Sequence, residues 1–448
     1  MQTTIAIFRA SISYFFMQED FLHYVWQHQY FDKTDLRTTD GQLVTVLRSG
    51  YRNADAGPDF LTARLQLDDV EWNGAVEIHL KASDWHRHQH QTDPKYDQVV
   101  LHVVFEADQL VERLDGSTVP ALALAARITP DLLQAYHSLL EQPTVVLPCA
   151  PQLQAVPEIT RTSMVERALL ERVELKASVV AALHQRLNDD WEATAYHTLA
   201  TAFGFQKNSE PLARLAKALP LAVIRRHRHD LLQLEALIFG QAGFLEGAVP
   251  PGEDEYIAAL RREFDFLRHK YSLHGTALAA HEWNFLRLRP ANFPTVRLAQ
   301  LAAVLHARPA LFDAMLTAAD LPTLTKFFQV STSTYWREHY RLGVAGKVPG
   351  LGKSSIHLLI TNVVVPLRVA YARHTGQAEL VESAVALLSL LPAEHNHITD
   401  DYADLGFQHR SSADSQGLLA LHRAYCAPRR CLHCAVGSRI MQRNLANR

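Results

Sequence analysis

The feature that most constrains the fold is a change of hydrophobic period part-way along the chain. Between about residues 41 and 127, short alternating apolar runs are separated by Gly, Asn, Asp and Pro, which is typical of strands and turns. After about residue 157 the apolar residues recur at helical spacing, starting with a long amphipathic segment over 159–187. This change predicts an α+β or α/β N-terminal domain followed by a large all-α domain.

The same pattern suggests where the domains begin and end. A helical segment over 19–31 precedes the strand-rich region, and a second predicted helix over 130–142 follows it. We therefore predict an α/β domain over 17–148 and a helical domain over 149–448. Met17 is a better start than Met1, so residues 1–16 are interpreted as an upstream extension.

Charge is distributed unevenly between the two predicted domains. Residues 17–149 contain 20 Asp and Glu against 10 Lys and Arg, whereas residues 150–448 contain 27 acids against 33 bases. An acidic half can chelate cations while a basic half contacts a polyanion, and two ordinary solvated surfaces are the alternative. The stretch 415–448 has no acid and six arginines: Arg423, Arg429, Arg430, Arg439, Arg443 and Arg448.

Targeting signals are weak in this sequence. The apolar stretch near residue 1 lacks a small-residue cleavage site, and no apolar run reaches the roughly 18–20 residues that span a bilayer. With 48% apolar and 20% charged residues, the composition is that of a globular protein. We expect a cytoplasmic protein without a membrane partner, whose cysteines are thiols or metal ligands rather than disulfides.

A pair of acidic residues in the strand-rich region suggests a metal site. Asp59 opens one predicted strand, and Glu77, His79 and Lys81 share one face of the next, because alternate residues of a strand point the same way. If the two strands form an antiparallel hairpin, Asp59 and Glu77 can bind one divalent cation such as Mg²⁺ or Mn²⁺. Such a cation lowers the pKa of bound water and neutralises charge on a phosphoryl group.

This acid pair resembles the PD-(D/E)XK nuclease core, with Pro58-Asp59 as its first element and Glu77 as its second acid. The resemblance implies a restriction-endonuclease-like core and a metal-dependent nuclease or phosphodiesterase acting on nucleic acid. His79 stands where the family has lysine, and we expect it to orient or deprotonate the attacking water. Lys81 is a poor substitute, because strand rise places it about 13 Å from Glu77 and His79 only about 6.6 Å away.

Two other interpretations compete with the nuclease. In the first, the hairpin has a solvated polar face and the protein is a non-catalytic scaffold that binds nucleic acid or protein. In the second, the histidine-rich stretch forms a His/carboxylate site for zinc, manganese or iron in an enzyme acting on a small substrate. We expect His86 and His90 in an exposed loop and His102 hydrogen-bonded in the core. The histidines concerned are His79, His86, His88, His90 and His102.

The four cysteines form a second candidate metal site. Cys426, Cys431 and Cys434 have the spacing C-x4-C-x2-C, and Cys149 is the remaining cysteine. Four thiolates can complete a tetrahedral zinc site or hold an iron–sulfur cluster. We expect a structural role, tying the C-terminal segment to the linker after the α/β domain; a set of unliganded thiols is the alternative.

Longer motifs resemble a bacterial family of proteins without an assigned function, domain-of-unknown-function family 2851. The resemblance extends from Met17 through the last cysteines and implies no particular reaction. It rests on "NADAGPDFLTARL", "WNGAVEIHLKASDWHRHQHQTDPKYDQVVLHVVFE", "LEALIFGQAGFL", "RLRPANFPTVRLAQLA" and "SQGLLALHRAYCAPRRCLHCAVG".

Overall fold

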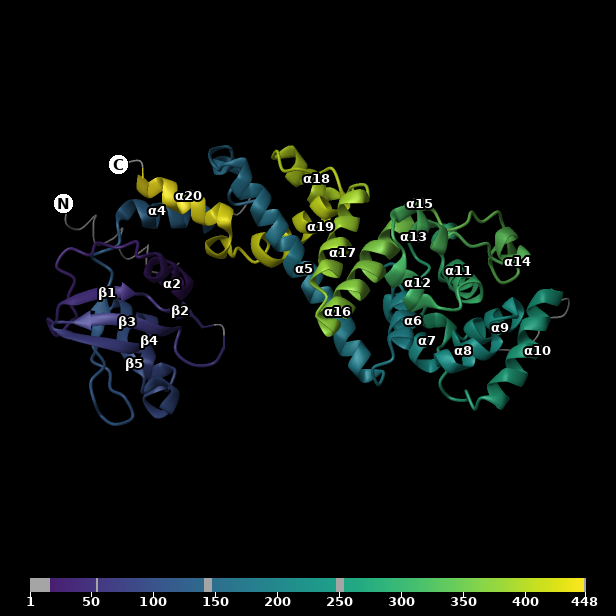
Figure 1. Cartoon of the computed structure of the whole chain (residues 1–448), viewed down its shortest axis with the longest axis horizontal. Coiled ribbons are helices and arrows are strands. Elements are labelled where there is room, and N and C mark those ends of the chain that lie inside the picture. Colours follow the sequence, from purple (N-terminus) through teal and green to yellow (C-terminus); the bar gives the residue numbers. More distant parts are fainter. Residues whose placement is uncertain (1–16, 54, 141–146, 247–253, 447–448) are drawn as a thin grey trace. The chain divides into compact units, whose positions relative to one another are not determined.

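The chain folds into two compact units, shown in a computed structural model (Figure 1). The first unit comprises residues 1–164 and 422–448, and the second comprises residues 165–421. The residues that the structure describes are 17–53, 55–140, 147–246 and 254–446. The extension predicted for residues 1–16 lies outside them.

The first unit contains a mixed β-sheet with helices before and after it, as the strand-rich pattern predicts. Its first helix, α2 (Glu19–His28), begins with two acids, which suit the positive end of the helix dipole. The strands are β1 (Val44–Arg48), β2 (Tyr51–Arg52), β3 (Phe60–Leu67), β4 (Val70–Lys81), β5 (Val99–Glu106) and β6 (Ala121–Ala123).

The sheet changes from antiparallel to parallel at β4. Its order is β1-β3-β4-β5-β6, with β2 paired to β3. Strands β1, β3 and β4 are antiparallel neighbours, whereas β5 runs parallel to β4 and β6 runs parallel to β5. In the parallel pair Glu77 lies opposite His102, and His79 lies opposite Val104, so residues 25 positions apart in sequence become neighbours.

The predicted hairpin is the antiparallel pair β3–β4. Only Asp68 and Asp69 separate the two strands. The register shifts between Phe60 and Ala63, where Thr62 adopts a left-handed φ of 56°. Such a bulge bends the strand and changes where its side chains point, and it lies just after Asp59.

Both faces of the sheet are covered at its centre. Residues 75–79 of β4 and residues 99–104 of β5 are all buried, as expected for strands that have parallel neighbours. The interpretation of a hairpin with a solvated polar face was therefore wrong, because α2 and the short helix α3 (Asp84–Arg87) both pack against β4.

The chain returns to the first unit after leaving the second. The segment contains two short turns, η7 (His422–Cys426) and η8 (Cys431–His433), and the helix α20 (Ala435–Ala446). Helix α20 lies beside α4 (Pro130–Leu140) (Figure 1) and buries Val436, Ile440 and Met441. The predicted division at residues 148/149 thus differs from the compact units, because this packing is between residues distant in sequence.

The second unit is helical, as the period after residue 157 predicts. Helix α5 (Glu158–Arg186) starts in the first unit and continues into the second. Asp190, Asp230 and Asp320 each cap a helix by accepting a backbone N–H bond. The described strands of this unit are the short hairpin β7 (His339–Arg341) and β8 (Val344–Ala345). Its larger helices include α6 (Trp191–Ala202), α9 (Leu231–Gln241), α10 (Glu255–Lys270), α11 (Pro294–Ala307), α16 (Val365–Thr375) and α17 (Ala378–Leu390).

One helical stretch of the second unit is long and apolar. Within Lys353–Thr375, a window of 18 residues has a mean hydropathy of 1.4, enough by length and composition to cross a membrane, and 72% of that window is buried inside the protein. Such burial is equally typical of the core helix of a globular unit.

Candidate metal centre

The two acids predicted from the sequence lie side by side. The backbone N–H of Asp59 donates to Oε2 of Glu77 over 3.1 Å, and Oδ2 of Asp59 accepts from the backbone N–H of Ile78 over 3.0 Å. Glu77 is only 4% exposed, whereas the Asp59 side chain is 27% exposed. Asp59 is therefore the more accessible carboxylate of the pair.

His79 joins the same cluster from the next inward position of β4. Its Nε2 lies 3.6 Å from Oε1 of Glu77 and 3.1 Å from Nδ1 of His88, and its Nδ1 lies 2.9 Å from Nε2 of His102. The residue is 2% exposed. Both ring nitrogens therefore face other side chains, an arrangement that suits a metal ligand better than a solvent-facing base.

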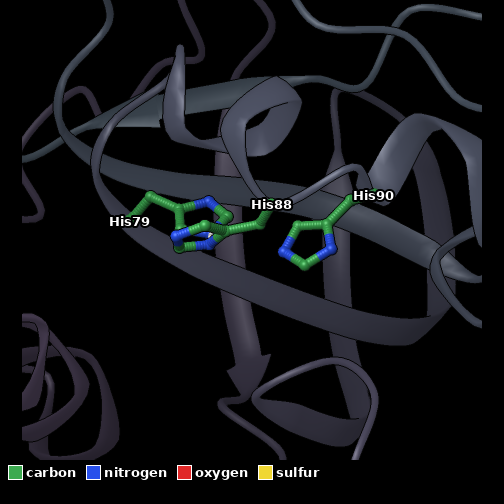
Figure 2. Close-up of side chains that lie close together, drawn as sticks. All are labelled: His79, His88 and His90. Carbon is green, nitrogen blue, oxygen red and sulfur yellow. Dashed lines mark hydrogen bonds between the residues drawn. The ribbon is translucent and has the colours of Figure 1, made fainter.

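The loop after α3 brings two more imidazoles to the cluster, His90 beside Glu77 and His88 beside His79. Gln89 adopts a left-handed φ of 62° between His88 and His90, and this turn lets both rings face β4. Figure 2 shows His79, His88 and His90 gathered together. Nε2 of His90 lies 3.2 Å from Oε1 of Glu77.

These atoms meet the distance requirement for a shared cation. One ligand atom from each of His79, His88 and His90 lies within 4.8 Å of the other two, and Oε1 of Glu77 is close to two of the rings. Nε2 of His90 is buried and makes no hydrogen bond of good geometry with the described residues. A buried nitrogen that faces a carboxylate without a well-formed hydrogen bond is incompletely satisfied, and a cation between the two groups would bind both.

Aromatic side chains hold the imidazoles in place. Tyr96 stacks on His90 with ring centroids 3.7 Å apart, and Trp85 lies edge-on to the same ring at 5.5 Å. The Trp85 indole is fully buried and donates to the carbonyl of Glu112 over 3.1 Å. His90 is thereby confined to one orientation.

Burial sets the charge of the cluster. It raises the pKa of Glu77 to about 7, although the interaction with His90 partly offsets it. Burial and the neighbouring imidazoles lower the pKa of His79 to about 2, and burial lowers the pKa of His102 to about 3. The two rings are therefore neutral near pH 7, the form in which histidine binds metals.

A second network, which the sequence interpretation missed, holds Asp59 from the side of α2. Nε2 of His23 lies 3.1 Å from Oδ2 of Asp59, and Nδ1 lies 3.6 Å from Oδ1 of Asp20. Arg52 of β2 donates to Asp20 over 2.7 Å and lies 3.1 Å from Nδ1 of His23. The available signal was the spacing of Asp20 and His23, which places them on one helix face.

This network alters the charges of its members. Burial alone would lower the pKa of His23, but hydrogen bonds to Asp20 and Asp59 outweigh it and raise that pKa to about 9. Hydrogen bonds from His23 and His433 hold the pKa of Asp20 well below its usual range. Burial raises the pKa of Glu19, the residue before Asp20 in the same helix, and the charge of His23 offsets part of this rise.

The remaining predicted residues divide between the cluster and its surroundings. The Lys81 ammonium lies 3.8 Å from Glu106, a pairing in keeping with its predicted distance from the acids. His102 is fully buried and hydrogen-bonded, as expected. His86 is exposed, as expected, but it lies in helix α3 rather than in a loop. The expectation for His90 was wrong, because it is 9% exposed and faces Glu77.

The cysteines also come together within the first unit. The four are free of disulfides, Cys431 and Cys434 are buried, and Cys149 and Cys426 are half-buried. Burial and the nearby thiols of Cys434 and Cys431 raise the pKa of Cys149 to about 12. Cys149 therefore lies within electrostatic reach of two cysteines that follow it by more than two hundred residues.

The fold and these clusters define an α+β unit with a His/carboxylate centre, joined to a helical unit. Residues 19–397 match the family described as "protein of unknown function (DUF2851)", and because the match covers most of the chain, the protein belongs to that family. Neither the curated proteins nor the solved structures include a significant match.

Proposed function

We propose that the first unit is a metal-dependent hydrolase that cleaves phosphodiester bonds in nucleic acid, with its metal at Glu77, His79, His88 and His90. The observation that carries the proposal is the convergence of three imidazoles on one another, two of them beside the buried carboxylate of Glu77 and with the more exposed Asp59 next to it. The sequence pattern around Asp59 and Glu77, which resembles a nuclease core, supplies the substrate class.

The donor set favours a particular class of cation. Imidazole nitrogens suit Mn²⁺, Fe²⁺ or Zn²⁺, whereas Mg²⁺ prefers a shell of oxygen atoms. Of the cations expected from the sequence, Mn²⁺ therefore fits these residues better than Mg²⁺. Such a cation supplies a Lewis acid that neutralises charge on a phosphoryl group and acidifies bound water.

The chain's own residues hold and orient the site. His102 fixes the ring of His79 through Nδ1, as outer partners do for many histidine ligands. His23, with its raised pKa, is charged near pH 7 and holds the Asp59 carboxylate. The exposed part of Asp59 is then placed to hold a water molecule or to accept its proton.

Exposed arginines in the same unit support a polyanionic substrate. The acid-free segment returns to the first unit, where Arg429, Arg430, Arg439 and Arg443 are exposed. Arg439 and Arg443, one turn apart on α20, line a hollow of about 320 Å³. Arginines of this kind contact the phosphate backbone without reading sequence.

The decisive test compares two histidines that lie two positions apart. His88→Ala should weaken Mn²⁺ binding and cleavage, because His88 contacts His79. His86→Ala is the matched control, since His86 is also exposed but lies outside the cluster. We would measure Mn²⁺ affinity by calorimetry and cleavage of labelled single- and double-stranded DNA and RNA.

The outcomes separate the competing functions. Loss of both binding and cleavage in His88→Ala alone supports the hydrolase. Metal binding without cleavage of any nucleic acid overturns it and favours the non-catalytic scaffold. Equal Mn²⁺ affinity in the two variants would contradict the proposed metal centre itself.

A further inference from the structure

The cysteines are carried by structural elements that pack together in the first unit. Cys149 precedes the 3₁₀ helix η3 (Ala150–Ala155), which packs against α20. Cys431 opens η8, and Cys434 lies between η8 and α20. Cys426 closes η7, which packs against η8. The topology therefore brings together the elements that carry the four cysteines, from two segments that are distant in sequence, and Cys149 lies within electrostatic reach of Cys431 and Cys434.

The backbone around the cysteines is tightly organised. The N–H of Arg429 donates to the carbonyl of Cys426 over 3.1 Å, and Arg429 itself has a left-handed φ of 56°. Gly437 lets α20 approach the loop closely, because a Cβ at this position would overlap the carbonyl oxygen of Cys431. The loop is thus fixed by specific contacts over residues 426–437.

Two of these thiols, Cys431 and Cys434, are buried, and Cys149 and Cys426 are half-buried. Cysteines from separate segments that meet inside one unit are a ligand set typical of zinc or of an iron–sulfur cluster, and a bound metal deprotonates such ligands. We propose that Cys149, Cys426, Cys431 and Cys434 hold a thiolate-ligated metal centre.

The spacing of the sulfurs favours one kind of centre. Thiolates around a tetrahedral zinc ion lie about 3.8 Å apart, given a Zn–S distance of about 2.3 Å. No three of the cysteine sulfurs come within 4.8 Å of one another in the part of the chain that the structure describes. The spacing C-x4-C-x2-C occurs among the ligands of iron–sulfur clusters, and on this sequence spacing we favour a cluster over zinc.

The centre would also stabilise the candidate active site, a consequence that rests on the proposed function. His433 lies between two of the cysteines, and its Nε2 is 3.6 Å from Oδ2 of Asp20 and 3.3 Å from the Arg52 guanidinium. Asp20 and Arg52 in turn hold His23 against Asp59. A metal that fixes residues 431–434 therefore fixes the far end of a chain of contacts that reaches the acid pair.

The test is elemental analysis of the full chain purified without oxygen. We expect iron with acid-labile sulfide and visible absorption, or zinc without them, and these two results identify the centre. Cys431→Ser should lose most of this metal, whereas the His88→Ala protein should retain it, which separates this centre from the histidine cluster. A protein without bound iron or zinc, or a Cys431→Ser protein that keeps all of it, overturns the proposal.

A second measurement covers the case in which Cys431→Ser fails to fold. In the native wild-type protein, ligated thiols should resist alkylation until a strong chelator is added, and then all four should react. Rapid alkylation of all four thiols before chelation contradicts the proposal. If the wild-type protein holds metal at the cysteines but shows no Mn²⁺-dependent cleavage, the result counts against the proposed hydrolase and leaves the cysteine centre standing.

Discussion

The backbone N–H of Asp59 donates to the carboxylate of Glu77 over 3.1 Å, and the Asp59 carboxylate accepts from Ile78 in return. This exchange locks the start of β3 to β4 just before the bulge at Thr62. It aligns an accessible acid with a buried one beside the imidazoles.

Glu77→Gln should abolish the charge of the cluster without changing its shape. We expect the affinity for Mn²⁺ to fall more than about tenfold, since even outer partners of metal ligands contribute that much. Without metal, the variant should be as stable as the wild type or more so, because burial raises the pKa of Glu77 and disfavours its charge. Calorimetry and thermal unfolding measure the two quantities; unchanged affinity would exclude Glu77 as a ligand.

The contacts of His23 should make stability depend on pH. Its pKa is raised to about 9 from 6.5. Its contribution to the free energy of unfolding is therefore fully present below pH 6.5 and is lost as the pH rises through 9. His23→Ala should lower the free energy of unfolding by about 1–3 kcal/mol near neutral pH. Denaturant titrations should show this deficit shrinking in alkaline buffer; a deficit that stays constant or widens with pH would contradict the charged pairing with Asp20 and Asp59.

Glu235 offers a second pH test, away from the site. Burial raises its pKa to about 7 from 4.5, although Tyr256 donates to it over 2.6 Å. Its contribution to stability is therefore complete below pH 4.5 and disappears as the pH rises through 7. Glu235→Gln should remove this decline and gain up to about 3 kcal/mol above pH 7, measured by chemical unfolding.

Glu382, which is exposed in the same unit, provides the control for this test. Its Gln variant should follow the wild-type pH profile. If Glu235→Gln shows the same decline between pH 4.5 and 7 as the wild type, another group is responsible.

Gly437→Ala tests the close packing of the cysteine loop. The added Cβ would overlap the Cys431 carbonyl, and overpacking of this kind costs about 1–3 kcal/mol. Gly350→Ala is the matched control, because nothing lies within 4 Å of a Cβ at that position. Thermal unfolding should show a lower melting temperature for Gly437→Ala than for Gly350→Ala. Equal melting temperatures would mean that the loop accommodates the added methyl group without losing stability.

Local patterns predicted much of this fold. The features that could not be predicted depend on packing between segments distant in sequence. The strand alternation of β3 and β4 and the helical period of α5 are properties of neighbouring residues, so the sequence reveals them directly. The return of α20 to α4 depends on contacts between distant segments, which no periodicity records.

The residues of the candidate site were likewise predictable only in part. Asp59, Glu77 and His79 follow a strand pattern and were identified from it. His90 was misjudged because its burial depends on the left-handed turn at Gln89, a conformation that glutamine seldom adopts. His23 was missed because its importance arises only when α2 packs against the sheet.

The discontinuity of the first unit has a consequence for how the protein is made. The ribosome synthesises the sheet first, then all of residues 165–421, and only then residues 422–448 that complete the same unit. At typical rates of elongation, the sheet waits roughly ten to fifty seconds for Cys431, His433 and α20. During that interval the helical unit can finish folding, while the first unit still lacks the C-terminal segment that completes it.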